Sequence, residues 1–168
     1  PGSKGNSLQI SIFDDTSGFS SWAWNNKFTG APGTSAYVSK YNPTANDEFH
    51  VAVIDVLGSF APANTVLEVF PFVSKAVDAK DEQGNSIYYR DVINTKSKYI
   101  YATAQLPQSA NTVGSSSVLG WGSSPVSNTS AAFATIGNTI DTRRLVSGTD
   151  GTIGTAEVVS SYNVFGNT

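Results

Sequence analysis

The clearest feature of the hydrophobic pattern is alternation in two stretches of the first half of the chain. In the first stretch, Leu8, Ile10 and Ile12 share one face and polar residues lie between them, which predicts a half-buried strand. In the second stretch, residues 48–56, apolar side chains occupy both alternating sets of positions. This pattern is typical of a central strand that is covered on both faces.

Two further stretches are rich in β-branched and aromatic residues, which favour strands. Residues 36–41 are one of them, and we expect the Asn42-Pro43 pair to end that strand because proline restrains its neighbour and lacks a backbone donor. Residues 65–75 are the other. Pro71 lies towards the far end of this stretch, so we expect that end to lie at a sheet edge or a bulge.

The apolar period lengthens after residue 86. One helical face is predicted by four positions at the spacing i, i+3, i+4 and i+7: Tyr89, Val92, Ile93 and Lys96. Ser86 is the predicted N-cap of this helix, and residues 98–104 are predicted to form the next strand. The sequence therefore predicts an α+β fold, in which one helix packs on a mixed or antiparallel sheet.

The second half of the chain is more polar. Residues 106–147 are rich in serine, glycine, asparagine and threonine, and such a segment buries little apolar surface over its own length. We interpret it as a long polar excursion with one short hairpin around Trp121. Residues 148–154 predict another loop, and residues 155–165 predict a C-terminal helix capped by Thr155.

These patterns organise the whole chain. They divide it into a core of residues 1–105, a polar loop excursion of residues 106–147, and a loop and terminal helix of residues 148–168. Nine apolar side chains are expected in the core: Leu8, Ile10, Val51, Val53, Val69, Tyr89, Val92, Ile93 and Ile100.

Composition narrows the function classes. The chain has 168 residues, a formal net charge of −3 and 14% charged residues, and it has no basic stripe to neutralise phosphates. We therefore expect no direct nucleic-acid partner. The absence of cysteine excludes disulfides, thiolate metal sites and cysteine nucleophiles. No apolar run approaches the roughly 20 residues of a membrane span, so no membrane partner is expected either.

Candidate catalytic and metal-binding residues are few. His50 is the single histidine, and a lone imidazole in the middle of a strand is more often a packed residue than a catalyst or ligand. Asp78, Asp81 and Glu82 superficially resemble a calcium loop but lack the EF-hand spacing. The glycines of residues 148–154 lack the strand and helix context of a phosphate-binding loop. We expect no catalytic residue, no cofactor and no metal, and we expect that the chain is not an enzyme.

Aromatic residues in the predicted loops suggest a different class of function. Trp22, Trp24 and Trp121 lie in predicted loops, where aromatic rings can stack on sugars, although buried anchors are commoner. The alternative to a structural role is therefore a carbohydrate- or receptor-binding β-rich module. Arg90 and Asp91 are adjacent on the predicted helix and point about 100° apart, so they are not expected to pair with each other. Arg90 is expected to meet a glutamate or aspartate elsewhere, or a neighbouring subunit.

A longer and ordered pattern covers residues 46–101. It begins with NDEFHVAVIDVLGSF and continues with NTVLEVFPFVSKAVDAKDEQGNSIYYRDVINTKSKYIYA. This run resembles the tail sheath protein of large contractile-tailed bacteriophages, in which a strand ending in Ile-Asp, a glycine turn, the VSKA and DAK motifs and a YYRDVIN helix follow one another. PGSKGNSLQISI at the start and RRLVSGTDG near the end are also similar to that family. Ser147 stands where the family usually carries a second glycine.

The resemblance implies a mechanical role. Sheath subunits stack as six-fold rings around the tail tube, and the sheath contracts to drive the tube through the host envelope. The implied partners are other copies of the subunit, the tail tube protein, and the baseplate and tail terminator proteins. The implied location is the virion tail, after assembly in the host bacterial cytoplasm. Because the chain lacks methionine and starts inside a family motif, we expect an internal fragment that is monomeric when isolated.

Overall fold

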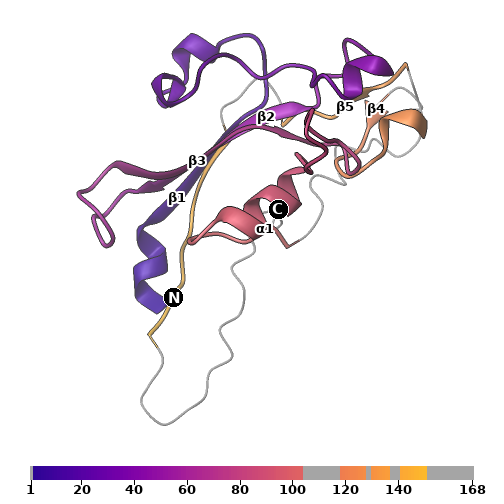
Figure 1. Cartoon of the computed structure of the whole chain (residues 1–168). Coiled ribbons are helices and arrows are strands. Elements are labelled where there is room, and N and C mark those ends of the chain that lie inside the picture. The colour runs from indigo at the N-terminus through magenta and orange to yellow at the C-terminus, as the bar shows by residue number, and fades with distance from the viewer. Residues whose placement is uncertain (1, 104–117, 128–129, 137–140, 151–168) are drawn as a thin grey trace.

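The computed structural model describes residues 2–103, 118–127, 130–136 and 141–150. Its centre is an antiparallel sheet in the order β3-β2-β1-β6, with one α-helix packed on it (Figure 1). The elements of this unit are β1 (Leu8–Phe13), β2 (Glu48–Asp55), β3 (Thr65–Ser74), α1 (Tyr89–Lys96) and β6 (Asp141–Arg144). The α+β fold with a packed helix is confirmed, and the C-terminal helix expected over 155–165 lies outside the described residues.

The predicted central strand is β2. It pairs with β1 without interruption, from Leu8 opposite Asp55 to Phe13 opposite His50. Its pairing with β3 has two register irregularities, and β3 forms one edge of the sheet. The edge position expected from Pro71 is therefore confirmed.

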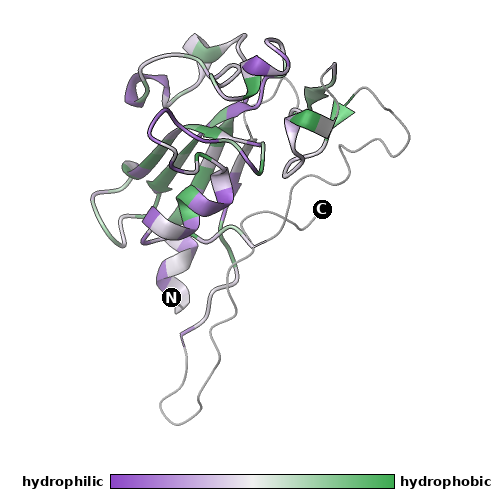
Figure 2. Cartoon of the chain, turned by 45° about the vertical axis from the view of Figure 1, so that its right-hand side comes forward, coloured by the Kyte–Doolittle hydropathy of each residue, from purple (hydrophilic) through white to green (hydrophobic). Residues whose placement is uncertain are grey.

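Both faces of the sheet are covered. Phe49, Val51 and Val53 of β2 belong to the cluster beneath α1, and Ala52 and Ile54 belong to a second cluster on the other face. Figure 2 shows hydrophobic residues concentrated in the strands of the sheet. The prediction for β2 is thus confirmed.

The prediction that β1 is half-buried is wrong. Ser11, which points away from the α1 face, is fully buried because Trp22 covers it and donates its indole N–H to the Ser11 hydroxyl at 2.9 Å. The serine is polar, but the alternation of the sequence does not show that an aromatic ring from a distant segment supplies its partner. β1 is therefore a buried strand on both faces.

The helix begins later than its predicted cap. Tyr88 is the N-cap residue of α1, so Ser86 lies two residues before it. The Ser86 hydroxyl donates to Asp91 at 2.7 Å and accepts the Tyr88 N–H at 3.3 Å, so it supports the first turn from outside. Tyr89 and Ile93 are buried, whereas Lys96 is exposed.

Two predicted strands are not strands. Residues 36–41 contain a 3₁₀-helix, η4 (Val38–Lys40), because the Ser35 hydroxyl accepts the Val38 N–H and the Ser35 carbonyl accepts the Ser39 N–H. Residues 98–103, the described part of the other predicted strand, pair with no strand. There the Asn94 side chain bonds both the N–H and the carbonyl of Ala102 and takes the place of a strand partner.

Four more short 3₁₀-helices occur in the described residues: η1 (Gly2–Ser7), η2 (Phe19–Ser21), η3 (Asn25–Lys27) and η5 (Pro125–Ser127). In the expected polar excursion, β4 (Val118–Leu119) and β5 (Ala132–Phe133) pair in parallel, so the hairpin predicted around Trp121 is wrong. β6 completes the main sheet and was not expected from the sequence. Among the residues described, no helix has the length and apolarity required to cross a membrane.

The predicted core is mostly correct. Seven of the nine side chains are buried, and Val92 packs half-buried against the same cluster. The prediction that Val69 is a core residue is wrong, because 38% of it is exposed. It lies on the edge strand, where the irregular pairing with β2 disturbs the strict alternation of inward and outward positions.

Candidate functional site

His50 is held in a structural role by two backbone groups. Its Nδ1 accepts the N–H of Phe72 at 3.0 Å, so the ring proton lies on Nε2, which donates to the carbonyl of Gly30 at 2.8 Å. The rings of Phe28 and Phe72 lie 4.4 and 4.6 Å from its centroid. Burial lowers the pKa of His50, against the opposing effect of the Gly30 carbonyl. The neutral ring therefore fastens residue 30 and β3 to β2.

In the acidic loop that superficially resembles a calcium site, the Asp81 carboxylate bonds to the backbone of its own loop. Asp81 accepts the backbone N–H groups of Gln83 and Asn85 at 3.0 and 2.8 Å, and Glu82 is exposed. Asp78 accepts hydrogen bonds from the hydroxyls of Tyr37 and Ser124. The three carboxylates are not brought together, and no group of three or more potential metal ligands occurs among the residues that are described.

The three tryptophans differ in exposure. Trp22 is buried and stacks on Phe13 and Phe28, with ring centroids 5.3 and 4.9 Å away. Trp121 is also buried, and its indole N–H donates to the carbonyl of Ala134 at 2.7 Å. Trp24 is half-buried. Two of the three rings considered for sugar stacking therefore serve as anchors inside the molecule.

Arg90 and Asp91 each bond to other groups, and the described partner of Arg90 is a backbone carbonyl, whereas an acidic side chain or a neighbouring subunit was expected. The Arg90 guanidinium donates to the carbonyl of Thr103 at 3.1 Å, and Asp91 accepts the hydroxyl of Ser86. The described start of the 148–154 loop is tied to the N-terminal segment, where Asp150 accepts both the N–H and the hydroxyl of Ser3.

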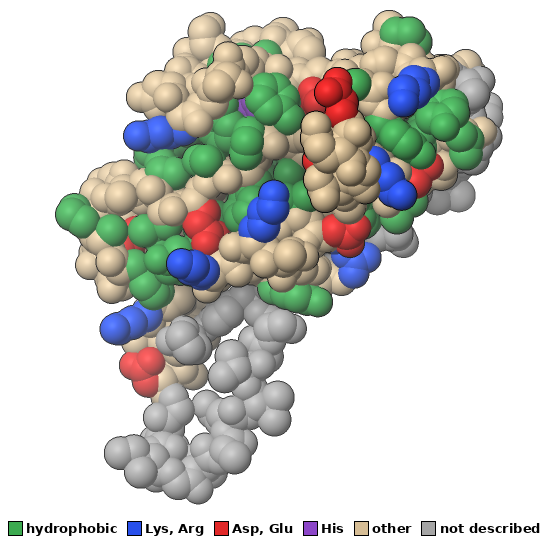
Figure 3. All heavy atoms as spheres, in the orientation of Figure 1, with side chains coloured by type: hydrophobic (Ala, Val, Ile, Leu, Met, Phe, Trp, Pro, Cys, Tyr) green, Lys and Arg blue, Asp and Glu red, His purple; other side chains and the backbone are tan. Residues whose placement is uncertain are grey.

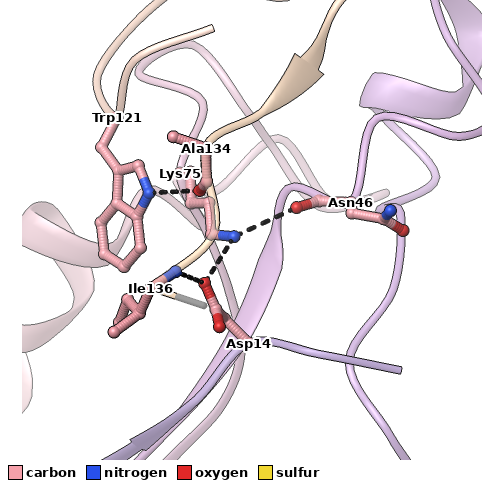
Figure 4. Close-up of polar contacts among 6 residues, drawn as sticks. All are labelled: Asp14, Asn46, Lys75, Trp121, Ala134 and Ile136. Carbon is pink, nitrogen blue, oxygen red and sulfur yellow. Dashed lines mark hydrogen bonds and ion pairs between the residues drawn. The ribbon is translucent and has the colours of Figure 1, made fainter. Parts of the chain in front are cut away.

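A buried charged cluster lies at the end of the sheet where β1 and β3 both finish. Lys75 Nζ lies 3.1 Å from Asp14 Oδ2, and these side chains are 0% and 2% exposed. Figure 4 shows the Lys75 amine reaching both Asp14 and the carbonyl of Asn46, which lies 3.3 Å from Nζ. Nζ also lies 5.2 Å from the centroid of the Trp121 ring.

The same cluster joins segments that are far apart in sequence. Ile136 donates its N–H to Asp14 Oδ2 at 2.7 Å, so one carboxylate oxygen accepts from two directions (Figure 4). The backbone of Lys75 donates to the carbonyl of Asp47 and accepts from the N–H of Gly122. Burial lowers the pKa of Lys75, while the attraction of Asp14 opposes that shift.

A second buried carboxylate, that of Asp55, shapes the opposite end of the sheet. It accepts the N–H groups of Gly58, Ser59, Phe60 and Ala61 at 3.0, 3.1, 2.7 and 2.8 Å. Although burial opposes ionisation, the Ser7 hydroxyl and these backbone donors hold the pKa of Asp55 well below its usual range. The β2–β3 turn is therefore fixed by one charged side chain.

The surface presented by this turn is apolar. Leu57 is 57% exposed and Phe60 is 39% exposed, and the ring of Phe60 meets Tyr99 edge to face at 5.3 Å. Hydrophobic side chains reach the surface where the β2–β3 hairpin projects from the body of the molecule (Figures 1 and 3).

A groove of about 490 Å³ lies between the end of β3, the loop of residues 81–87 and one side of α1. Phe72 and Val92 form part of its apolar lining, and Asp91 and Lys96 supply charges. The polar loop of residues 78–86 thus lies beside this groove.

Sequence reasoning missed the buried clusters around Lys75 and around Asp55. Lys75 directly follows a strand and Asp14 directly follows another, and charged residues at those positions are usually solvated. The signal for Asp55 was stronger, because it lies three residues before a Gly-Ser pair, and aspartates beside such turns often accept backbone N–H groups. A scan against protein-family models and searches of curated proteins and of solved structures found no match to this chain.

Proposed function

We propose that this chain is a structural segment of a bacteriophage contractile tail sheath subunit, which assembles around the tail tube and acts mechanically. The observation that carries the proposal is the ordered motif run over residues 46–101, which occupies one continuous unit of β2, β3 and α1.

Several motif positions support the backbone through their side chains. Asp55 of the Ile-Asp motif accepts four N–H groups of the following turn. Lys75 of VSKA enters the buried cluster with Asp14, and Asn94 of DVIN bonds both backbone groups of Ala102. A pattern whose polar residues hold turns and loops in place fits a protein that must keep its shape under load.

Ser147 gives independent support. Its backbone φ is +67°, in the left-handed region that favours glycine. The sheath family usually carries glycine at this position of its loop. A backbone conformation that suits glycine at a position where the resemblance expects glycine argues that this second segment belongs to the same pattern.

The mechanical role needs a rigid subunit with exchangeable contacts. The buried polar centres at both ends of the sheet fasten loops to strands, and the apolar hairpin end and the α1 groove are available as contact surfaces. Contraction then corresponds to two packings of the same rigid subunit, whose interface free energies differ when summed over many copies. The proposed partners are other sheath subunits, the tube protein, and the baseplate and terminator proteins.

The test is to locate the chain on virions of a contractile-tailed phage that encodes it. Immunogold labelling with antibody against the chain is expected to decorate the whole length of the tail, and label confined to fibres or the tail tip would contradict the proposal. Because an assembled sheath can hide the epitope, tails are also dissociated into sheath, tube and baseplate fractions for quantitative mass spectrometry. If the sheath fraction contains no peptides of the chain, the proposal is overturned, whatever the labelling shows.

A further inference from the structure

Lys75 and Asp14 form a contact whose chemistry goes beyond a simple ion pair. The amine and the carboxylate touch at 3.1 Å between Nζ and Oδ2, and neither side chain is meaningfully exposed. The backbone holds both groups in place, since Asp14 directly follows β1 and Lys75 directly follows β3. An amine and a carboxyl group that are fixed in contact in a dry site have a very high effective concentration.

The surrounding hydrogen bonds also match the donor and the acceptor of an amide. An ammonium group has three donors, and its hydrogen-bond acceptors among the described residues are Asp14 Oδ2 and the Asn46 carbonyl. A secondary amide has one N–H and one carbonyl oxygen. The Asn46 carbonyl is placed to accept the amide N–H. The Ile136 N–H, 2.7 Å from Asp14 Oδ2, is placed to donate to the amide carbonyl oxygen.

Electrostatics favours the same product. Removing an ammonium and a carboxylate from water carries a large desolvation penalty, which their mutual attraction offsets only with good geometry and further hydrogen bonds. A neutral amide at the same place carries no such penalty. Burial also lowers the pKa of Lys75, which raises the share of the neutral, nucleophilic amine.

We propose that Lys75 and Asp14 condense spontaneously to an intramolecular isopeptide bond, which makes this cluster a self-modification site. Within the ion pair, one proton of the Lys75 ammonium is transferred to the Asp14 carboxylate and is carried on Oδ1, which gives a neutral amine and a carboxylic acid protonated on Oδ1. The Nζ lone pair attacks Cγ, the Nζ–Cγ bond forms and the Cγ–Oδ1 bond breaks. Oδ1 leaves as water with its own proton and one proton from Nζ, and Oδ2 remains as the amide oxygen that Ile136 donates to.

The location explains what the bond would do. It would join the end of β1 to the end of β3, on either side of the central strand β2, beneath the ring of Trp121. Pulling force on the sheet could then not slide these two strands past each other at that end. The proposal does not depend on the sheath assignment, because any protein with this cluster could form the bond.

The test is the intact mass of the full chain after complete denaturation. We expect a mass lower than the sequence mass by one water molecule. After trypsin digestion, cleavage behind Lys75 is expected to be blocked, and a branched peptide should join residues 5–27 to residues 41–80. A chain with the full sequence mass that trypsin cleaves behind Lys75 has only the ion pair, and that result would overturn the proposal.

Two variants and one alternative reaction sharpen the result. Lys75→Arg keeps a cation but has no nucleophilic amine, and it is expected to show the full mass, whether or not it folds. Lys80→Arg changes an exposed lysine and should keep the loss of water. An Asp-Gly pair such as Asp150-Gly151 can also lose water by forming a succinimide. A loss that maps to residues 145–168, or that survives in Lys75→Arg, would contradict the isopeptide bond.

Discussion

The two faces of the sheet bury their side of β2 equally well but are covered in different ways. On one face, Val51 and Val53 are fully buried beneath α1 and its neighbours. On the other face, Ala52 and Ile54 are equally buried beneath irregular chain, whose largest buried side chain is Trp22. A regular helix covers one face, and 3₁₀ turns with an aromatic cluster cover the other.

The difference shows two ways to cover a sheet. A helix repeats its apolar face every turn, so several side chains of the same element cover the sheet together. The irregular face has no such repeat, and it relies on one large ring and on His50, which bonds the carbonyl of Gly30 and the N–H of Phe72. We therefore expect the irregular face to depend on fewer residues, each with a larger effect.

Removing the Trp22 ring should break the irregular face. Trp22→Ala leaves a large cavity and removes the donor to the Ser11 hydroxyl, so we expect a loss of about 3–5 kcal/mol in the free energy of unfolding. Urea denaturation measures the loss. Hydrogen exchange should show faster exchange for residues 19–33 than for α1. Trp24→Ala removes a half-buried ring of the same segment and is the matched control, and equal losses in both variants would refute this account.

The helical face should respond less to the loss of Ile93, one of its fully buried side chains. Ile93→Ala removes a fully buried side chain from α1, and we expect a loss of about 2–5 kcal/mol, with the helix still formed. Circular dichroism and urea denaturation check both parts of this prediction. Thr95→Ala changes an exposed position of the same helix and should alter stability by less than about 0.5 kcal/mol. A similarly small loss for Ile93→Ala would show that α1 does not pack on the sheet by this face.

Acid should weaken the irregular face through His50. Its folded pKa lies below its ordinary value because of burial, so the unfolded chain binds the proton first, near pH 6.5. The contribution of His50 to stability is therefore complete above that pH and declines as the pH falls through the lowered folded pKa. His50→Gln keeps one donor and one acceptor without titrating, so its stability should fall less between about pH 7.5 and pH 5.

Glu48 would hide this effect unless it is removed. Burial raises its pKa to about 7, with Asp47 adding to the shift, so the folded state gains a proton in the same range and acid favours folding at this group. The comparison is therefore made in a Glu48→Gln background, by urea denaturation across the pH range. Identical pH profiles with and without His50 in that background would contradict the prediction.

The sequence predicts those elements in which a regular backbone alone decides which side chains are buried. In β2, every residue from Phe49 to Asp55 is buried, and the continuous apolar run indicates that directly. In α1, the spacing of Tyr89 and Ile93 indicates the buried face. Periodicity is sufficient in both elements because the regular backbone decides which side chains point inward.

The remaining features depend on contacts between distant residues. The expected strand over 36–41 is a 3₁₀ turn because the Ser35 hydroxyl accepts the Val38 N–H, and Ser35 is itself held by Asp47. β6 escapes prediction because Asp141–Arg144 is short and polar, as suits an edge strand. The Lys75 cluster likewise needs Asp14, 61 residues earlier in the chain, and no local pattern carries that pairing.

The smallest expected effect concerns the edge strand, where the same substitution can compare an exposed position with a buried one. Val69→Thr replaces a methyl group by a hydroxyl on a side chain that is 38% exposed, so water can solvate the hydroxyl. We expect a change of less than about 0.5 kcal/mol in the free energy of unfolding. Val51→Thr makes the same change at a fully buried position and should cost about 1–3 kcal/mol, because the hydroxyl loses water there. Urea denaturation of both variants decides the matter: equal losses would mean that Val69 is a core residue after all, and that the cover over Ala52, its partner on β2, extends to the edge of the sheet.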